Sequence, residues 1–163
     1  MSELYRDTGV VLRTYKLREA DRIIVMHTRD NGKVRAVAKG VRKTKSKFGA
    51  RLEPMSHVNV QLYRGRELDI VTQAESVEPL APMLSSLDRA SQGLAVLEAV
   101  DQLSLEREPN PQLFRMVVGV LRTIASDPSP INVPAFYWKL LANEGMRPQL
   151  DMCVRCGESG PGT

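Results

Sequence analysis

The sequence has few of the residues on which catalysis, disulfide bonding or membrane insertion depends. Its 163 residues include two cysteines, two histidines and only 5% aromatic side chains. No apolar run reaches the roughly 18 residues of a membrane-spanning helix, and the charged first fifteen residues do not resemble a signal peptide. Two cysteines cannot form a disulfide framework, which favours a reducing compartment. We therefore expect a cytoplasmic protein with no membrane partner.

The usual catalytic motifs are also missing. The sequence contains no G-x-S-x-G, H-E-x-x-H, P-loop or G-x-G-x-x-G pattern. His27 and His57 each lie within a strand pattern, where a partly buried or edge-strand imidazole is the ordinary role. Glu106 and Glu108 flank Arg107 at the end of an expected helix, as is typical of solvated surface. The sequence therefore favours a binding protein over an enzyme.

Positive charge is concentrated in one short segment. Residues 1–78 carry a net charge of +6, and residues 79–163 carry −2. Residues 29–51 hold nine Lys and Arg against a single Asp, a net charge of +8 in 23 residues. Solubility alone favours surfaces of mixed sign. The segment therefore indicates a surface that binds a polyanion, although a mobile basic loop without a partner remains the alternative.

The first half of the chain has the pattern of short β-strands. Apolar runs or alternating residues occur at 10–12, 23–26, 34–38, 58–63 and 68–73. Asn31-Gly32 lies between the second and third runs and predicts a hairpin with a type I′ turn, in which both residues have positive φ. Five short strands in about 75 residues suit a small closed barrel, because closure removes exposed sheet edges.

The second half has the pattern of helices. The change comes at Glu78-Pro79, and helical periodicity follows at residues 87–105, 113–124 and 133–143. In the first helix, the spacing places Leu94, Leu97, Val100 and Leu103 on one face. We therefore expect an α+β chain in two domains, with a basic barrel in residues 1–78 and an α-helical domain in residues 79–163.

A C-x-x-C motif stands near the end of the sequence. Cys153 and Cys156 are followed by Gly157, an arrangement in which two thiolates can point at one metal, whereas Zn²⁺ takes four ligands. A redox role needs the motif at the start of a helix in a thioredoxin-like pattern, but here it follows a helix in a Gly/Pro-rich segment. The motif predicts half of a zinc ribbon, with a second ligand pair beyond Thr163.

Three stretches of the basic half together resemble the RecO family of bacterial recombination mediators. They are Glu19-Ala20-Asp21-Arg22-Ile23, the run from Gly32 to Lys43 that closes with Phe48–Pro54, and Leu62-Tyr63-Arg64-Gly65 followed by Leu68. In the helical half, Gly145, Pro148 and Leu150 lead into the C-x-x-C motif, as in that family. The resemblance covers nearly the whole chain.

The resemblance implies a fold and a function. The family has an N-terminal OB-fold barrel and then a helical domain that carries a zinc ribbon, with one structural zinc in the complete protein and no known enzymatic turnover. Its members bind single- and double-stranded DNA, anneal complementary strands, and act with RecR to load the recombinase RecA onto DNA covered by single-strand-binding protein. A cytoplasmic, nucleoid-associated location follows from that role.

The residues themselves suggest how such a surface would bind DNA. Lys33, Arg35 and Lys39 have even spacing along the third strand, so they share its outer face. The expected DNA-binding residues are Lys33, Arg35, Lys39, Arg42, Lys43, Lys45, Lys47 and Arg51. Aromatic platforms for bases are scarce, and Phe48 is the candidate, whereas Tyr63 is expected to pack in the core. Binding should therefore involve mainly the phosphate backbone.

Two other functions also fit this sequence. A basic barrel does not by itself distinguish DNA from RNA, so an RNA-binding OB-fold protein is one alternative. The other is a protein–protein adaptor, in which the helical half is a docking platform and the basic loop is incidental. In the third helix, Phe136 and Trp138 are expected to belong to the core.

Overall fold

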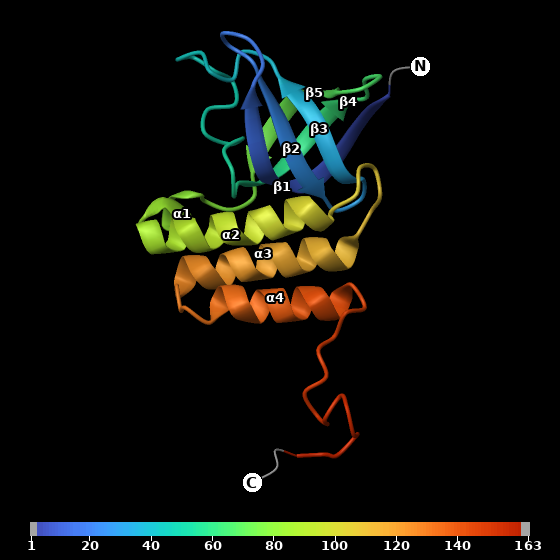
Figure 1. Ribbon diagram of the computed structural model, residues 1–163. Coiled ribbons are helices and arrows are strands. Elements are labelled where there is room, and N and C mark those ends of the chain that lie inside the picture. The colour runs from blue at the N-terminus through green and yellow to red at the C-terminus, as the bar shows by residue number, and fades with distance from the viewer. Residues whose placement is uncertain (1–2, 161–163) are drawn as a thin grey trace.

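The computed structural model describes residues 3–160, which form a barrel followed by a layer of helices (Figure 1). The strands are β1 (Leu4–Lys16), β2 (Arg22–Thr28), β3 (Gly32–Ala38), β4 (His57–Tyr63) and β5 (Asp69–Ser76). The helices are α1 (Ala81–Leu84), α2 (Leu87–Leu103), α3 (Pro111–Ser126) and α4 (Asn132–Asn143). The boundary expected between residues 78 and 79 lies between β5 and α1.

The five strands close into a barrel in the order β1-β2-β3-β5-β4. All neighbouring pairs are antiparallel except β3 and β5, which pair in parallel at Ala36 and Val37. This order is that of an OB-fold, and it confirms the five-stranded barrel predicted from the sequence. On β3, Val34, Ala36 and Ala38 are fully buried inside the barrel, as the alternation predicts.

The β2–β3 hairpin forms where it was predicted, but with a different turn. Thr28 pairs with Gly32, so three residues rather than two connect the strands. Gly32 has φ of +64°, whereas Asn31 does not have positive φ, and the turn is therefore not type I′. A Cβ on Gly32 would also lie 2.0 Å from the carbonyl oxygen of Glu108. Glycine at position 32 thus allows the positive φ of the turn and leaves room for the α2–α3 loop to approach the backbone closely.

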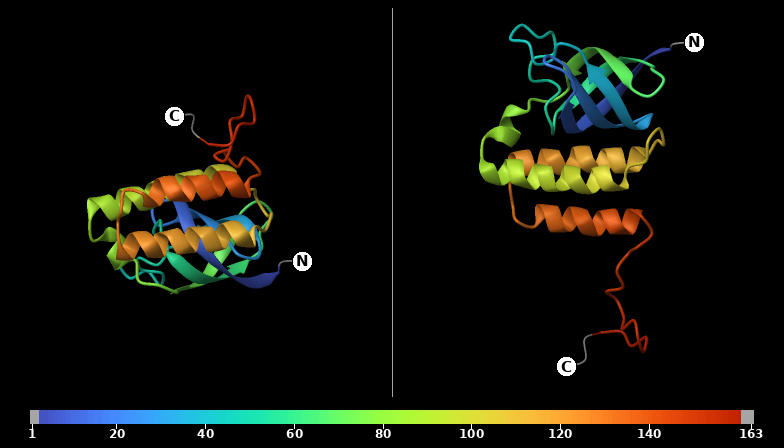
Figure 2. Two further views of the ribbon diagram at one scale, coloured as in Figure 1. Left: turned by 90° about the horizontal axis from the view of Figure 1, so that it is seen from below. Right: turned by 45° about the horizontal axis from the view of Figure 1, so that its top comes forward.

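A β-bulge in β1 directs side chains of this strand into two hydrophobic cores, one inside the barrel and one shared with the helices. The register with β2 shifts between Val11 and Arg13. Val11 packs inside the barrel, whereas Val10, Leu12 and, from β2, Val25 pack with the buried residues of the helices. The helices are therefore attached to the outer wall of the barrel by a shared apolar core. Figure 2 shows α2 and α3 against the barrel and α4 on their far side.

Helix α2 buries two of the four residues predicted to share its apolar face, Leu97 and Val100, but not Leu94 and Leu103. Its buried residues are Gly93, Val96, Leu97 and Val100, while Leu94 is 51% exposed and Leu103 also reaches solvent. The reason is close packing at Gly93, where an added Cβ would lie 2.4 Å from the sulfur of Met55. No helix within residues 3–160 is long and apolar enough to cross a membrane.

The other two long helices agree better with the sequence. Leu113, Val117, Leu121 and Ile124 form the buried stripe of α3, joined by Phe114 and Val118. In α4, Phe136 is buried as expected, but Trp138 is 47% exposed and the expectation that it belongs to the core is wrong. The outer side of α4 thus carries an aromatic residue in contact with solvent.

Candidate nucleic-acid interface

The β1–β2 loop and the start of the β3–β4 segment lie together at the end of the barrel away from the helices (Figure 1). The backbone N–H of Arg42 donates to the carbonyl of Ala20 at 3.0 Å. The N–H of Gly40 donates to the Asp21 carboxylate at 2.8 Å, and the Arg42 guanidinium donates to the carbonyl of Glu19 at 3.0 Å. These bonds hold the two loops, which flank the β2–β3 hairpin, together as one surface.

Six cationic side chains gather on these two loops and at the adjoining end of β1. We call them the loop basic surface, and they are Lys16, Arg18, Lys39, Arg42, Lys43 and Lys45, all exposed. No ion pair joins any of them to a carboxylate of residues 3–160. The surface includes four of the eight predicted DNA-binding residues. Lys16 and Arg18 were missed because they precede the +8 segment and only the fold brings them to it.

Lys47 and Arg51 lie toward β5 instead. The Lys47 ammonium donates to the carbonyl of Thr72 at 3.0 Å, and Arg51 donates to the carbonyl of Lys47 at 3.0 Å. Both line a groove of about 660 Å³ with residues of β5, including Glu75. These two predicted residues therefore extend the positive charge around the end of the barrel, next to a carboxylate.

The structure places Lys33 and Arg35 under the C-terminal end of α2. The Lys33 ammonium lies 3.2 Å from a carboxylate oxygen of Asp101, and its side chain is only 17% exposed. It also donates to the backbone carbonyl of Asp101 at 2.6 Å. Arg35 lies 3.7 Å from Glu106. Lys33 and Arg35 thus stand apart from the loop basic surface and next to acidic groups.

The prediction that Phe48 stacks on bases is wrong. Its side chain is 1% exposed and packs with Leu52 among the barrel residues. A ring buried on all sides has no face to offer a base, and Phe48 instead anchors the basic segment to the barrel. Tyr63 also departs from expectation, because it is 39% exposed rather than in the core.

Tyr15 is the exposed aromatic residue of this region that sequence reasoning missed. It lies on the outer face of β1 and is 46% exposed. Its cross-strand partner is Ile23, which is in turn opposite Val37 of β3. The signal was present in the alternation of Arg13, Tyr15 and Leu17, but the strand pattern of residues 10–12 appeared to end before it.

A buried ion pair joins the start of β5 to the loop between α2 and α3. Asp69 is fully buried and accepts a 2.7 Å hydrogen bond from Arg107 and another from the hydroxyl of Tyr5. Burial opposes ionisation of Asp69, but the bonds from Arg107 and Tyr5 outweigh it and lower its pKa. Burial and the bond to Asp69 raise the pKa of Tyr5 to about 12. The group is therefore a stable ion pair at neutral pH.

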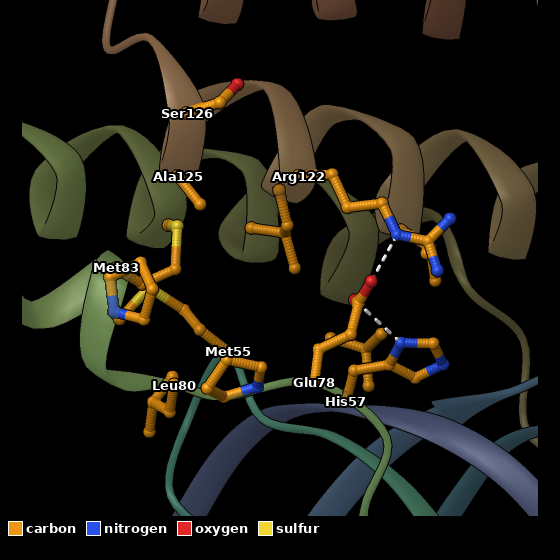
Figure 3. Close-up of a pocket in the computed structure, with 13 residues that line it drawn as sticks. Met55, His57, Glu78, Leu80, Met83, Arg122, Ala125 and Ser126 are labelled. Atoms are coloured by element: carbon orange, nitrogen blue, oxygen red, sulfur yellow. Dashed lines mark hydrogen bonds and ion pairs between the residues drawn. The ribbon is translucent and has the colours of Figure 1, made fainter.

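A largely apolar pocket of about 320 Å³ lies between the barrel and the helices (Figure 3). Met55, Leu80 and Met83 form part of its wall. On one side, Glu78 accepts hydrogen bonds from Arg122 and from His57, whose Nδ1 lies 3.0 Å away. Burial raises the pKa of Glu78, but the bonds from His57 and Arg122 more than offset this and lower it. Glu78 is therefore held as the anion of a network that joins β4 to α3.

Cys153 and Cys156 lie in the exposed segment after α4. The N–H of Gly157 donates to the carbonyl of Cys153 at 2.9 Å, which closes a tight turn. Hydrogen bonds from the backbone N–H groups of Cys156 and Arg155 lower the pKa of the Cys153 thiol, as suits a metal ligand. Residues 3–160 contain no cluster of three or more potential metal ligands. The two cysteines could supply at most two of the four ligands that a structural zinc takes.

Two family models match the chain over almost its entire length. The model for the N terminal of recombination protein O matches residues 1–80, which contain the barrel. The model for the C terminal of recombination protein O matches residues 84–163, which contain α2, α3, α4 and the cysteine pair. Both matches agree with the barrel and helices of the structure and with the resemblance in the sequence. The chain belongs to the recombination protein O (RecO) family of DNA repair and recombination proteins.

Proposed function

We propose that this protein is a recombination mediator that binds single- and double-stranded DNA without reading its sequence and anneals complementary strands. The observation that supports this most directly is the loop basic surface, whose six cations come from the end of β1 and from two loops tied together by hydrogen bonds. Cations on a fixed backbone match the phosphates of a nucleic acid, which are the same for every sequence.

Annealing follows from the same electrostatics. Two complementary strands repel each other through their phosphates, and a surface that neutralises phosphates lowers that repulsion without competing for the bases. Membership of the RecO family supports the further proposal that the protein acts with RecR and single-strand-binding protein to help load RecA. In that role its place is with the DNA in the cytoplasm, and no catalytic step is required of it.

We also propose that Cys153 and Cys156 supply two thiolate ligands of a structural zinc, with the other two ligands from residues outside 3–160. The lowered pKa of Cys153 favours the thiolate that zinc requires. Bound zinc would hold the segment after α4 in one conformation. Zinc content measured on the protein, before and after Cys153→Ser, tests this directly. A full equivalent of zinc in the variant would contradict it.

The central experiment is a DNA-binding titration over a salt series. A labelled single strand of about 30 nucleotides is titrated with protein, and fluorescence anisotropy gives the affinity. If about 4–6 phosphates are neutralised, the logarithm of the association constant should fall with that of salt with a slope of about −3 to −4. Weak binding, or affinity that does not depend on salt, would favour a protein–protein adaptor. Tighter binding to a matched RNA strand would favour an RNA-binding protein.

A further inference from the structure

An apolar strip crosses the outer face of β1, β2 and β3. Tyr15, Ile23 and Val37 are cross-strand neighbours in one row. Their sequence neighbours Ile24 and Ala36 are fully buried inside the barrel, so the row itself points outward. Tyr15 is 46% exposed, and Ile23 and Val37 are partly exposed beside it. The strip is thus a shallow apolar surface with one accessible aromatic ring.

The helices stop short of this strip. They cover the same outer wall at Val10, Leu12 and Val25, which belong to the shared core. Arg13 and Arg35 are the cross-strand partners of Val25 on either side. Arg13 pairs with Glu98 at 2.7 Å, and Arg35 lies near Glu106. The row of Tyr15 is the next outward-facing row along the strands, and its side chains are at least partly exposed. In Figure 1 the helices lie against one end of β1, β2 and β3. One margin of the strip is therefore a row of neutralised arginines.

The other margin is strongly positive. Lys16 and Arg18 come one and three residues after Tyr15, and Lys39 comes two residues after Val37. All three belong to the loop basic surface, and none has an ion-pair partner within residues 3–160. An exposed ring beside unpaired cations matches a ligand that has flat apolar groups attached to a chain of negative charges. A single-stranded nucleic acid has this chemistry.

We propose that Tyr15 stacks on a base of single-stranded DNA, over the apolar surface of Ile23 and Val37, while the phosphates lie on the loop basic surface. This proposal rests on the proposed DNA-binding function and adds a preference to it. Bases of a single strand can unstack and reach the ring, whereas those of a duplex are stacked on each other. Tyr15 therefore favours the single strand over the duplex, and the cations bind both.

The test compares three probes of the same length: a single strand, its duplex, and an abasic strand that has only sugar and phosphate. The unmodified protein should bind the single strand more tightly than the abasic one. Tyr15→Ala should weaken single-strand binding by about 5- to 100-fold, the range of one stacked base. It should leave affinity for the other two probes within about twofold, because phosphate contacts remain.

Two further variants control for the ring and for aromatic loss in general. Tyr15→Phe should bind as the unmodified protein does, because the ring and not the hydroxyl stacks. Trp138→Ala removes a similarly exposed aromatic residue from α4, which lies on the far side of the helices, and should leave all three affinities unchanged. Thermal melting of each variant establishes that it is folded at the assay temperature.

A fluorescence measurement detects the stacking of a base on residue 15 directly. The sequence has one tryptophan, so Tyr15→Trp combined with Trp138→Phe places the sole indole on the strip. The single strand should quench its fluorescence and the abasic strand should not. Equal affinity of the unmodified protein for the single and abasic strands, or an equal loss on all probes in Tyr15→Ala, would overturn the stacking role and leave the proposed function intact. Binding to none of the three probes would overturn both.

Discussion

Asp69 and Arg107 form an ion pair of 2.7 Å that connects the first residue of β5 to the loop between α2 and α3. Arg107 adopts φ of +61°, which is unusual for a residue with a side chain. The same loop pairs with β3, since the N–H of Lys33 donates to the carbonyl of Leu105 and that of Arg107 to the carbonyl of Lys33, both at 3.1 Å. Barrel and helices are thus joined around one buried carboxylate.

Loss of the guanidinium should therefore destabilise the whole chain. Arg107→Ala leaves a fully buried carboxylate without its cation, which should lower the free energy of unfolding by about 2–4 kcal/mol. Urea denaturation at neutral pH measures this. Arg107→Gly relieves the strained φ but loses the same ion pair, so it should recover only about 1 kcal/mol of the loss. Full recovery in the glycine variant would show that strain rather than the ion pair dominates.

The loop basic surface gives a prediction about DNA affinity. Lys39→Glu combined with Lys43→Glu removes two phosphate contacts and adds two negative charges. Affinity for a single strand should fall by more than tenfold, and the slope against salt should become shallower by about 1–2 units. Both side chains are exposed, so the thermal midpoint should change little. Unaltered affinity in a folded double variant would place the DNA elsewhere.

Lys33 provides the matched control. Its ammonium is held by Asp101 beneath α2, with 17% of the side chain exposed. Lys33→Met should therefore lower the free energy of unfolding by about 1–2 kcal/mol while leaving the DNA affinity and its salt slope nearly unchanged. A large change in affinity in this variant would restore Lys33 to the set of DNA contacts predicted from the sequence.

His27 should make stability depend on pH below neutrality. The ring is 1% exposed, and its Nδ1 lies 3.0 Å from the hydroxyl of Ser104. Burial keeps the pKa of His27 below its usual 6.5 in the folded protein. Between the two pKa values the unfolded chain binds a proton that the folded one does not, so the free energy of unfolding falls as pH falls below about 6.5. Denaturation midpoints at several pH values measure this, and His27→Gln should flatten the profile.

Phe48 should matter for stability rather than for contact with bases. Its ring is buried in the barrel, so Phe48→Ala should cost about 3–5 kcal/mol and loosen the basic segment. Phe48→Leu keeps most of the apolar volume and should bind a single strand with unchanged affinity at a temperature where it is folded. A stacking role would instead make the leucine variant bind weakly while remaining stable.

The features that sequence reasoning identified are local in the chain. Alternation along β3 and β4, the glycine at the β2–β3 hairpin and the prolines between helices each act over a few residues, so the five strands and three long helices could be predicted. The face that α2 buries could not, because it depends on how Met55 and Met83 pack against Gly93. Helical periodicity alone does not identify which apolar side of a helix meets the barrel.

Only part of the candidate site could be identified from the sequence, because the rest depends on contacts between separate segments. Charge density identified the segment from residue 29 to 51, but not that Asp101, 68 residues after Lys33, neutralises part of it. Nor did it show that Phe48 turns inward while Lys16 and Arg18 join the surface from the end of β1 and the loop after it. Each of these facts depends on contacts between distant segments. The resemblance to a known family supplied the fold but not these placements.

The core shared by barrel and helices has a consequence for dividing the chain. A fragment that ended near residue 80 would expose Val10, Leu12 and Val25 to water and would leave Asp69 without Arg107. Removal of the helices would therefore leave an exposed apolar patch on the barrel wall, which favours aggregation, and a carboxylate without its cation. The two family models divide the sequence near that point, but the shared core and the Asp69–Arg107 ion pair cross the division. A barrel produced without the helices would therefore differ from the barrel of the whole chain in its exposed surface and in its stability.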